Sequence, residues 1–293
     1  MKKILCISGL CLMLIPFGCN RKQDESVARV VTLNLRYDNP SDSINQWSKR
    51  AAIVREFIAE EQPDLIGMQE VLAGQFYFLD SVLTDYSSVG VGRDDGAKEG
   101  EMNPVFFRKE RFDLVRTKTF WLSETPEVPG SKSWGSELPR IVTWMELSDR
   151  NTSTHFFFFN THFAHDSDSA RIESARLLLC KIDTIASGFP FVVTGDFNMP
   201  HSSKGYDMLT GPYESVPLLM DSYALAEKRH IGPAYTFNGF SDKTSGGRID
   251  YIFVRNGMQV LGNRTIIKKA RGVYISDHWP VMAEVGLKWS GLN

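Results

Sequence analysis

Apolar residues recur along the chain with two spacings, one typical of helices and one typical of strands. Helical spacing occurs at 47–60, 76–83 and 169–185, and in the first of these Ile53 and Phe57 share a face. Runs rich in β-branched and aromatic residues predict strands at 28–37, 65–70, 104–107, 112–122, 141–147, 154–162, 191–194, 249–254, 259–268 and 279–285. The pattern therefore predicts a mixture of helices and strands.

The order of these elements indicates one α/β domain built on two packed sheets. Strands are followed by helices early in the chain, strands dominate the middle, and strands return at the end. No internal repeat, low-complexity tract or change of composition marks a boundary after residue 26. We expect a signal peptide at 1–18, a tether at 19–27 and a single catalytic domain at 28–293.

The N-terminus has the layout of a signal peptide, with Lys2 and Lys3 before an apolar run at 4–17. This run is shorter than the roughly 20 apolar residues that a membrane-spanning helix needs. We therefore expect an exported protein of the cell envelope. Cys19 directly after this segment is typical of a lipid anchor. Simple cleavage and release, to the periplasm or the outside, is the alternative, because Pro16-Phe17 departs from the usual lipoprotein pattern.

Cysteine usage excludes an intramolecular disulfide framework in the mature chain. Cys6 and Cys11 leave with the signal peptide, and Cys19 is either acylated or lost, so Cys180 remains. The pattern places Cys180 on the apolar side of a predicted helix, and no repeated Cys/His spacing occurs nearby. We expect Cys180 to be a buried structural thiol.

Polar residues with catalytic potential stand where apolar strands end. Asp196 and Asn198 follow such a strand and are two residues apart, so on an extended backbone they face the same side. Gly195 permits close approach of another group. A simple strand-to-turn junction, in which Asp and Asn are common, explains this segment equally well.

A carboxylate within an apolar strand also indicates a functional site. Asp250 lies in a strand so apolar that its carboxylate needs a partner, because an unpaired buried charge is costly. A histidine is a natural partner, because a carboxylate on one ring nitrogen fixes the tautomer. The segment Asp277-His278 follows Tyr-Ile-Ser. His162 also ends an apolar strand, where a lone histidine is usually structural.

Together these positions are difficult to explain as a set of unrelated turns. They are Asn34, Glu70, His162, Asp196, Asn198, Asp250, Asp277 and His278. The set is rich in oxygen and contains no thiolate, which suits Mg²⁺ or Mn²⁺ better than zinc.

Six ordered motifs resemble those of the endonuclease/exonuclease/phosphatase superfamily. They are Thr-Leu-Asn-Leu-Arg-Tyr, Pro-Asp-Leu-Ile-Gly-Met-Gln-Glu-Val, Phe-Asn-Thr-His-Phe, Thr-Gly-Asp-Phe-Asn, Arg-Ile-Asp-Tyr-Ile-Phe and Ser-Asp-His-Trp-Pro-Val. The resemblance covers roughly residues 28 to 287. It implies the deoxyribonuclease I-like fold, a four-layered α/β sandwich of two mixed sheets flanked by helices.

The resemblance also implies the metal site and the water-activating group. Glu70 would be the principal metal ligand, with Asn34 and Asp277 completing or supporting the site. Asp196 would orient or deprotonate the attacking water. The metal would be Mg²⁺ or Mn²⁺, which offsets charge on the phosphate.

The remaining motif residues would contact the phosphate. Asn198 and His162 would donate hydrogen bonds to it. Asp250 would pair with His278, which binds the phosphate and protonates or stabilises the departing group. Glu101 would orient His162.

Further substrate contacts are expected from segments that border this site. The candidates are Arg93, Arg108, Arg140 and Arg171, whose guanidinium groups match phosphate geometry, and Trp134 for stacking. Solvated arginines or structural ion pairs are an equally good interpretation of each arginine.

These observations predict a divalent-metal-dependent hydrolase of phosphate esters that uses direct attack by water. Phosphodiesterase, nuclease and phosphatase activities all remain open. Loss of Lys2 and Lys3 takes the formal net charge from −2 to −4, which disfavours a long-duplex footprint. We expect a small phosphate ester, nucleotide or short oligonucleotide as the substrate, and a monomeric protein.

Two other functions are compatible with parts of the sequence. A non-catalytic surface protein that binds a phosphate ligand could retain the fold, although every implied ligand is present. A serine hydrolase would need a nucleophile beside a histidine, and Ser276 near His278 lacks the context of a nucleophile elbow.

Overall fold

A computed structural model of the chain describes residues 26–211, 219–243 and 245–287. The predicted signal peptide, the lipid-anchor cysteine Cys19 and most of the tether lie outside these residues. Within the described ranges, no helix is long and apolar enough to cross a membrane.

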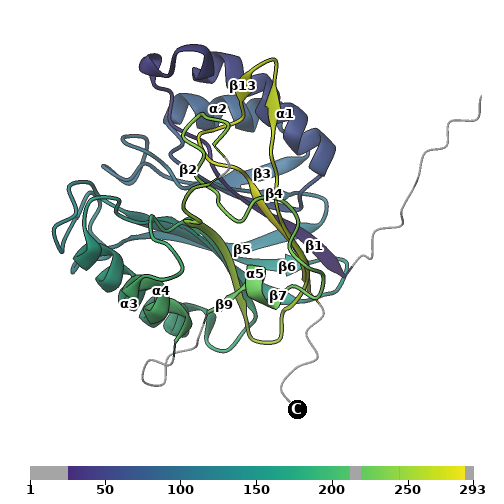
Figure 1. The fold of residues 1–293 in the computed structure, drawn as a ribbon. Helices are drawn as coiled ribbons and strands as arrows, with labels where there is room; N and C mark the ends of the chain where they lie inside the picture. The colour runs from purple at the N-terminus through teal and green to yellow at the C-terminus, as the bar shows by residue number, and fades with distance from the viewer. Residues whose placement is uncertain (1–25, 212–218, 244, 288–293) are drawn as a thin grey trace, which may run out of the picture.

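Two six-stranded sheets face each other at the centre of the molecule (Figure 1). The first has the order β11-β14-β1-β2-β4-β3, formed by Gln259–Thr265, Val281–Gly286, Val27–Asn34, Leu65–Gln69, Val105–Arg108 and Tyr86–Val89. The second has the order β5-β6-β7-β8-β10-β9, formed by Phe112–Trp121, Ile141–Asp149, His155–His162, Phe191–Asp196, Asp250–Arg255 and Met220–Asp221. A small hairpin, β12-β13, comprises Lys269–Ala270 and Val273–Tyr274.

Helices cover the outer face of each sheet (Figure 1). The first sheet is covered by α1 and α2, at Trp47–Glu61 and Ala73–Val82. The second is covered by α3 and α4, at Asp168–Ala186 and Lys204–Thr210. The short elements η1 and α5 occupy Pro40–Asn45 and Ser222–Leu225. The four-layered sandwich that the sequence predicted is confirmed.

The strand β7 shows how the sequence produces these layers. Successive strand residues face opposite sides, so a continuous aromatic run supplies two cores at once. Phe156 and Phe158 belong to the core between the sheets, whereas Phe157 and Phe159 pack with α3. All four are buried, each at most 2% exposed. A strand of this kind can therefore lie only in the middle of a covered sheet.

A polar contact joins the two sheets close to the strand ends. Asn160 accepts a hydrogen bond from Gln69 at 2.7 Å and another from Thr194 at 3.0 Å, and all three side chains are fully buried. Gly67 allows this approach, because a Cβ at that position would lie 2.1 Å from the Thr194 hydroxyl. The contact fixes the ends of β2, β7 and β8 relative to one another.

Strand direction brings the candidate residues to one edge of the sandwich. The pair β1–β2 is parallel, as is β7–β8, so their carboxyl ends lie at the same edge. The strand β10 runs antiparallel to β8, which places its first residue, Asp250, opposite Asp196. Residues from both sheets therefore meet in one place.

One expectation about the helices was wrong. Cys180 is exposed, not buried. The buried stripe of α3 includes Ala175, Leu178, Leu179 and Ile182, and at 3.6 residues per turn position 180 turns away from it. Because the neighbouring residues are apolar, the sequence does not show that position 180 lies outside the buried stripe.

Candidate active site

Asn34 links the two sheets at the base of the site. Its side-chain amide donates to Glu70 Oε1 and to Asp196 Oδ2, each at 2.9 Å. Asn34 ends β1 and is fully buried, whereas Glu70 follows β2 in the left-handed region at φ 56°. This turn after the strand directs the Glu70 carboxylate toward the opposite sheet.

The expected pairing of Asp250 with His278 is present. Asp250 Oδ2 lies 2.8 Å from His278 Nδ1, and both side chains are buried. Burial alone lowers the pKa of His278, but the neighbouring carboxylates of Asp250 and Asp196 outweigh it and raise the pKa well above its usual value. His278 therefore carries a proton on each nitrogen, and its Nε2 lies 3.8 Å from Asp196 Oδ2.

Asp196 is the central carboxylate of the site. Burial, and then the charge of Asp250, raise its pKa to about 7. Its Oδ1 accepts from the backbone N–H of Asn198 at 2.9 Å, and its Oδ2 lies 3.6 Å from His162 Nε2. A carboxylate with such a pKa can accept a proton near neutrality.

His162 and Asn198 form a second unit on the other side of Asp196. Burial, and then the positive charges of Arg140 and Arg93, lower the pKa of His162 well below its usual value, so the ring is neutral. The Asn198 amide donates to His162 Nε2 at 2.9 Å and to the Phe163 carbonyl at 3.0 Å. Both of its amide hydrogens are therefore engaged by the protein in this state.

Glu101 lies on the far side of His162, as expected, but at a distance. Its Oε2 is 3.9 Å from His162 Nδ1, which is too long for a hydrogen bond, and it accepts from Arg93 at 2.7 Å. Burial raises the pKa of Glu101, Arg93 opposes this, and the charge of Glu70 adds to it. Arg93 thus contributes to the site through Glu101.

Asp277 lies in the loop between β13 and β14. It accepts a hydrogen bond from the Ser276 hydroxyl at 3.2 Å, and the Arg36 guanidinium lies 3.8 Å away. Burial raises the pKa of Asp277, and the charge of Glu70 adds to this rise. Asp277 and Glu70 are therefore close enough to repel each other.

Arg50 fixes the loops that carry these groups. Its guanidinium, fully buried on α1, donates to the carbonyls of Leu35, Arg36, Asn45 and Ile275. Burial lowers its pKa to about 10. The end of β1 is thereby tied to the segment that carries Asp277.

These side chains surround one pocket of about 570 Å³. Its wall also contains residues for which the sequence gave no specific signal: Arg36, Tyr37, Leu138, His165, Phe237 and Ile249. The Phe237 ring meets His278 edge to face at 5.1 Å and is 43% exposed. Arg36 could have been noticed, since it follows Asn34 in the first motif.

The weaker candidates divide into those at the site and those away from it. Arg140 lines the pocket. Arg171 supports the neighbouring loop by donating to the Ala164 carbonyl at 2.8 Å. Trp134 contacts that loop through its backbone, where its carbonyl accepts from Ser167 at 2.9 Å. Neither Arg171 nor Trp134 lines the pocket.

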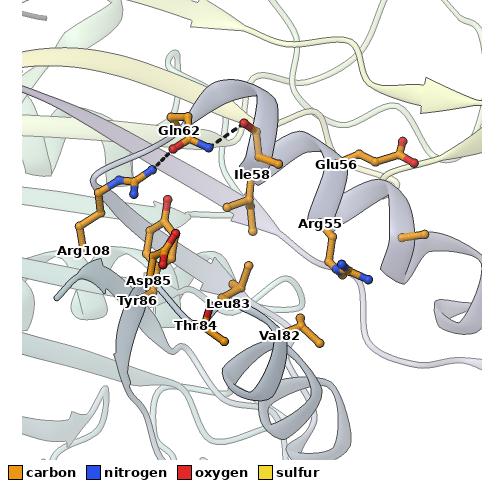
Figure 2. Close-up of a pocket in the computed structure, with 12 residues that line it drawn as sticks. Arg55, Glu56, Ile58, Gln62, Val82, Leu83, Thr84, Asp85, Tyr86 and Arg108 are labelled. Carbon is orange, nitrogen blue, oxygen red and sulfur yellow. Dashed lines mark hydrogen bonds between the residues drawn. The ribbon is translucent and has the colours of Figure 1, made fainter. Parts of the chain in front are cut away.

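Arg108 was expected near the site and lies elsewhere. It borders a second pocket, of about 350 Å³, between α1 and the segment after α2. Figure 2 shows its guanidinium directed at Gln62, to which it donates a hydrogen bond. It also lies 5.0 Å from the Tyr86 ring centroid. Arg108 ends β4, which runs antiparallel to β2, so it leaves the sheet at the opposite edge.

The donor set fits a divalent cation. Glu70, His162 and Asp196 can bring three ligand atoms within 4.8 Å of one another. The cluster of Asp196, Asp250 and His278 is equally compact, but the doubly protonated His278 ring has no lone pair to offer an ion. Several carboxylates crowd here, and their mutual repulsion adds to burial in raising the pKa of Asp196 and Asp277. A cation would relieve this repulsion, and oxygen donors suit a hard ion.

Comparisons with known proteins agree with this geometry. A family model described as the endonuclease/exonuclease/phosphatase family matches residues 31–278. A Bacteroides vulgatus endonuclease/exonuclease/phosphatase structure is 38% identical, covers 89% of this chain and 99% of its own, and has a TM-score of 0.85. A Bacteroides thetaiotaomicron mannosyl-6-phosphatase is 35% identical over 88% and 99%, with a TM-score of 0.80. An uncharacterized protein of Acanthamoeba polyphaga mimivirus is 30% identical over 87% and 98%.

Proposed function

The chain belongs to the endonuclease/exonuclease/phosphatase family, whose members hydrolyse phosphate esters, and we propose that it is a divalent-metal-dependent hydrolase of small phosphate esters. The observation that carries this proposal is the convergence of Glu70, Asp196 and His278 in one pocket, with Asp250 paired to His278. Two features support a small substrate. The pocket measures about 570 Å³, and a relative at 35% identity is a mannosyl-6-phosphatase.

Glu70, Asn34 and Asp277 would hold a Mg²⁺ or Mn²⁺ ion, which would offset the negative charge of the phosphate oxygens. Asp196 accepts the proton of the attacking water. Burial raises the pKa of Asp196 above that of an exposed carboxylate, which makes it a better proton acceptor. No covalent nucleophile is needed.

His278 provides the positive charge opposite this base. Its Nδ1–H is held by Asp250 at 2.8 Å, so its Nε2–H is available to a phosphoryl oxygen or to the departing oxygen. His162 is neutral and its Nε2 accepts a hydrogen bond from Asn198, so it lines the site without adding charge. One histidine therefore carries charge and the other does not.

A direct assay tests the proposal. Purified protein with Mn²⁺ or Mg²⁺ should release p-nitrophenol from p-nitrophenyl phosphate or from bis(p-nitrophenyl) phosphate. Excess chelator should abolish the release, and so should His278→Gln. Glu70→Gln should abolish it at a Mn²⁺ concentration that just saturates wild type. Arg116→Met is the matched control, because Arg116 is an exposed residue of β5 paired with Glu146. Full activity in chelator, or in both site variants, would overturn the proposed mechanism.

A further inference from the structure

Arg140 is a buried cation with unused hydrogen-bond donors. It immediately precedes β6, is 4% exposed and lines the pocket beside Glu101 and Asp196. Its Nη2 donates to His165 Nδ1 at 2.9 Å. Its Nε and Nη1 have no hydrogen-bond partner among the described residues. Buried polar groups are normally satisfied, so two open donors on one side chain require an explanation.

The charge of Arg140 is also poorly matched to its surroundings. Burial lowers its pKa, and the neighbouring cation Arg93 lowers it further. The carboxylates of Glu101, Asp196 and Glu70 act in the opposite direction, yet none of them accepts a hydrogen bond from it. A buried charge held without its acceptors is a site prepared for an anion.

Two other arginines of this region are less available to a ligand in the pocket, although Arg93 Nε also has no hydrogen-bond partner among the described residues. Arg36 donates through Nε and Nη2 to Asp42, each at 2.9 Å. Arg93 donates to Glu101 and does not line the pocket. Arg140 is thus the arginine of the pocket wall whose open donors are available to a ligand.

His165 holds Arg140 in position from the rim. It is exposed, lies in the loop between β7 and α3, and also lines the pocket. Its Nδ1 accepts the hydrogen bond from Arg140, which places the ring proton on Nε2. That second nitrogen is left free to donate to a ligand at the mouth of the pocket.

We propose that Arg140, held by His165, binds the third terminal oxygen of a phosphate monoester and so selects monoesters over diesters. A monoester has three terminal oxygens and nearly two negative charges at neutral pH, whereas a diester has two terminal oxygens and one charge. The ion that Glu70, Asn34 and Asp277 would hold and the Nε2–H of His278 would each provide a contact for one terminal oxygen. The open donors of Arg140 then suit a phosphoryl group with a third terminal oxygen and a second negative charge.

This inference rests on the proposed function and deepens it, because it names the substrate class. It assigns Arg140 to substrate binding and His165 to positioning Arg140. The bond that breaks is the one between phosphorus and the ester oxygen, and water supplies the replacing oxygen, as in the proposed reaction.

The test compares a monoester with a diester in three proteins. Wild type, Arg140→Met and Arg140→Lys are assayed with Mn²⁺ on p-nitrophenyl phosphate and bis(p-nitrophenyl) phosphate. For Arg140→Met we expect kcat/KM on the monoester to fall about 100-fold, the effect of losing two charge-assisted hydrogen bonds, and on the diester much less. Arg140→Lys should recover part of the monoester rate, because it restores the charge but not the fork of donors.

Binding gives a second readout that is independent of turnover. The affinity of the Mn²⁺-loaded protein for inorganic phosphate, measured by calorimetry, should fall by a similar factor in Arg140→Met. Its affinity for Mn²⁺ should not weaken, because the change removes a cation from beside the carboxylates. His165→Ala should reduce the monoester rate less, about 10-fold, because it leaves the guanidinium in place but loose. Arg116→Met should match wild type throughout.

The outcomes separate this inference from the proposed function. If wild type hydrolyses neither ester, the proposed function fails, and the phosphate affinity of Arg140→Met still decides the role of Arg140. If wild type is active but Arg140→Met loses both esters equally, or keeps its phosphate affinity, the inference fails and the proposed function stands. A wild-type preference for the diester also overturns the inference.

Discussion

Two pockets of the molecule differ in whether their polar groups have hydrogen-bond partners. In the pocket between α1 and the segment after α2, Arg108 donates to Gln62, and Tyr86 donates to the Pro63 carbonyl at 2.6 Å. In the active-site pocket and directly behind its wall, by contrast, several buried polar atoms have no partner among the described residues. They include Arg140 Nε and Nη1, His162 Nδ1 and Asp250 Oδ1.

This difference indicates what each pocket does. An unsatisfied buried donor or acceptor costs about 1–3 kcal/mol, so folding alone would not retain several of them in one place. They persist where a ligand, an ion or ordered water completes them. The polar groups of the pocket between α1 and the segment after α2 are therefore satisfied by the protein itself, whereas those of the active-site pocket would be completed by the proposed substrate and metal.

The largest effect should follow a change at the central carboxylate. Asp196→Asn preserves shape and the hydrogen bond from the Asn198 backbone, but removes the group that accepts a proton from water. We expect kcat to fall about 10³- to 10⁴-fold, near the upper range for general base catalysis. Initial rates at saturating Mn²⁺ measure this. A fall of less than tenfold would assign water activation to another residue.

A smaller loss of activity is expected from a change at Asp250, which acts on the substrate only through His278. Asp250→Asn leaves His278 in place but removes the carboxylate that fixes its tautomer and raises its pKa. We expect the rate to fall about 10- to 100-fold, as is usual for partners of this kind. Without this carboxylate the pKa of His278 falls, so the ring stays protonated only at lower pH. The variant should therefore lose less activity at acidic pH than at neutral pH. An unchanged pH profile would contradict the pairing.

Stability should change in the opposite direction to activity. Because burial and Glu70 raise the pKa of Asp277 in the folded chain, its ionised form opposes folding once pH exceeds the unfolded value. In chelator at pH 7.5, Asp277→Asn should therefore melt at a higher temperature than wild type. The difference should vanish as pH falls below about 4, the ordinary value for Asp. Thermal scans at both pH values measure it, and a lower melting temperature at pH 7.5 would refute the repulsion.

The smallest effect should come from the second pocket. Arg108→Met breaks contacts with Gln62 and Tyr86 only, on the edge of the sheet away from the site. We expect kcat/KM within about twofold of wild type and a stability change of at most about 1 kcal/mol, as for other exposed pairs. Steady-state rates and urea melts measure both. A fall in kcat/KM as large as that expected for Arg140→Met would contradict the proposed difference between the two pockets.

Much of the site could be predicted because its residues stand at strand ends. Asn34, His162 and Asp196 each close a strand whose apolar run is visible in the sequence. The cost of an unpaired buried carboxylate predicted a histidine partner for Asp250, and the family resemblance identified that histidine as His278. Strand periodicity and the cost of burying a charge both depend on a few neighbouring residues, so they can be recognised in the sequence itself.

The remainder depends on tertiary structure. Arg108 and Arg140 have the same chemistry and both adjoin apolar strands, but they leave the sheets at different edges. His165 and Phe237 come from loops whose paths no periodicity describes. Cys180 shows the same limit on a helix, where a one-position offset decides between core and solvent. Short elements such as β9 and α5 carry too few residues for a pattern.

The most direct test of the central claim is the metal dependence of hydrolysis in one matched pair. Wild type and Glu70→Gln are freed of metal and titrated with Mn²⁺, while p-nitrophenyl phosphate turnover and the melting temperature are followed together. We predict that Mn²⁺ raises both quantities in wild type, and that Glu70→Gln, folded as judged by circular dichroism, requires at least about tenfold more Mn²⁺ for either. Turnover by metal-free wild type, or identical Mn²⁺ curves for the two proteins, would contradict the account.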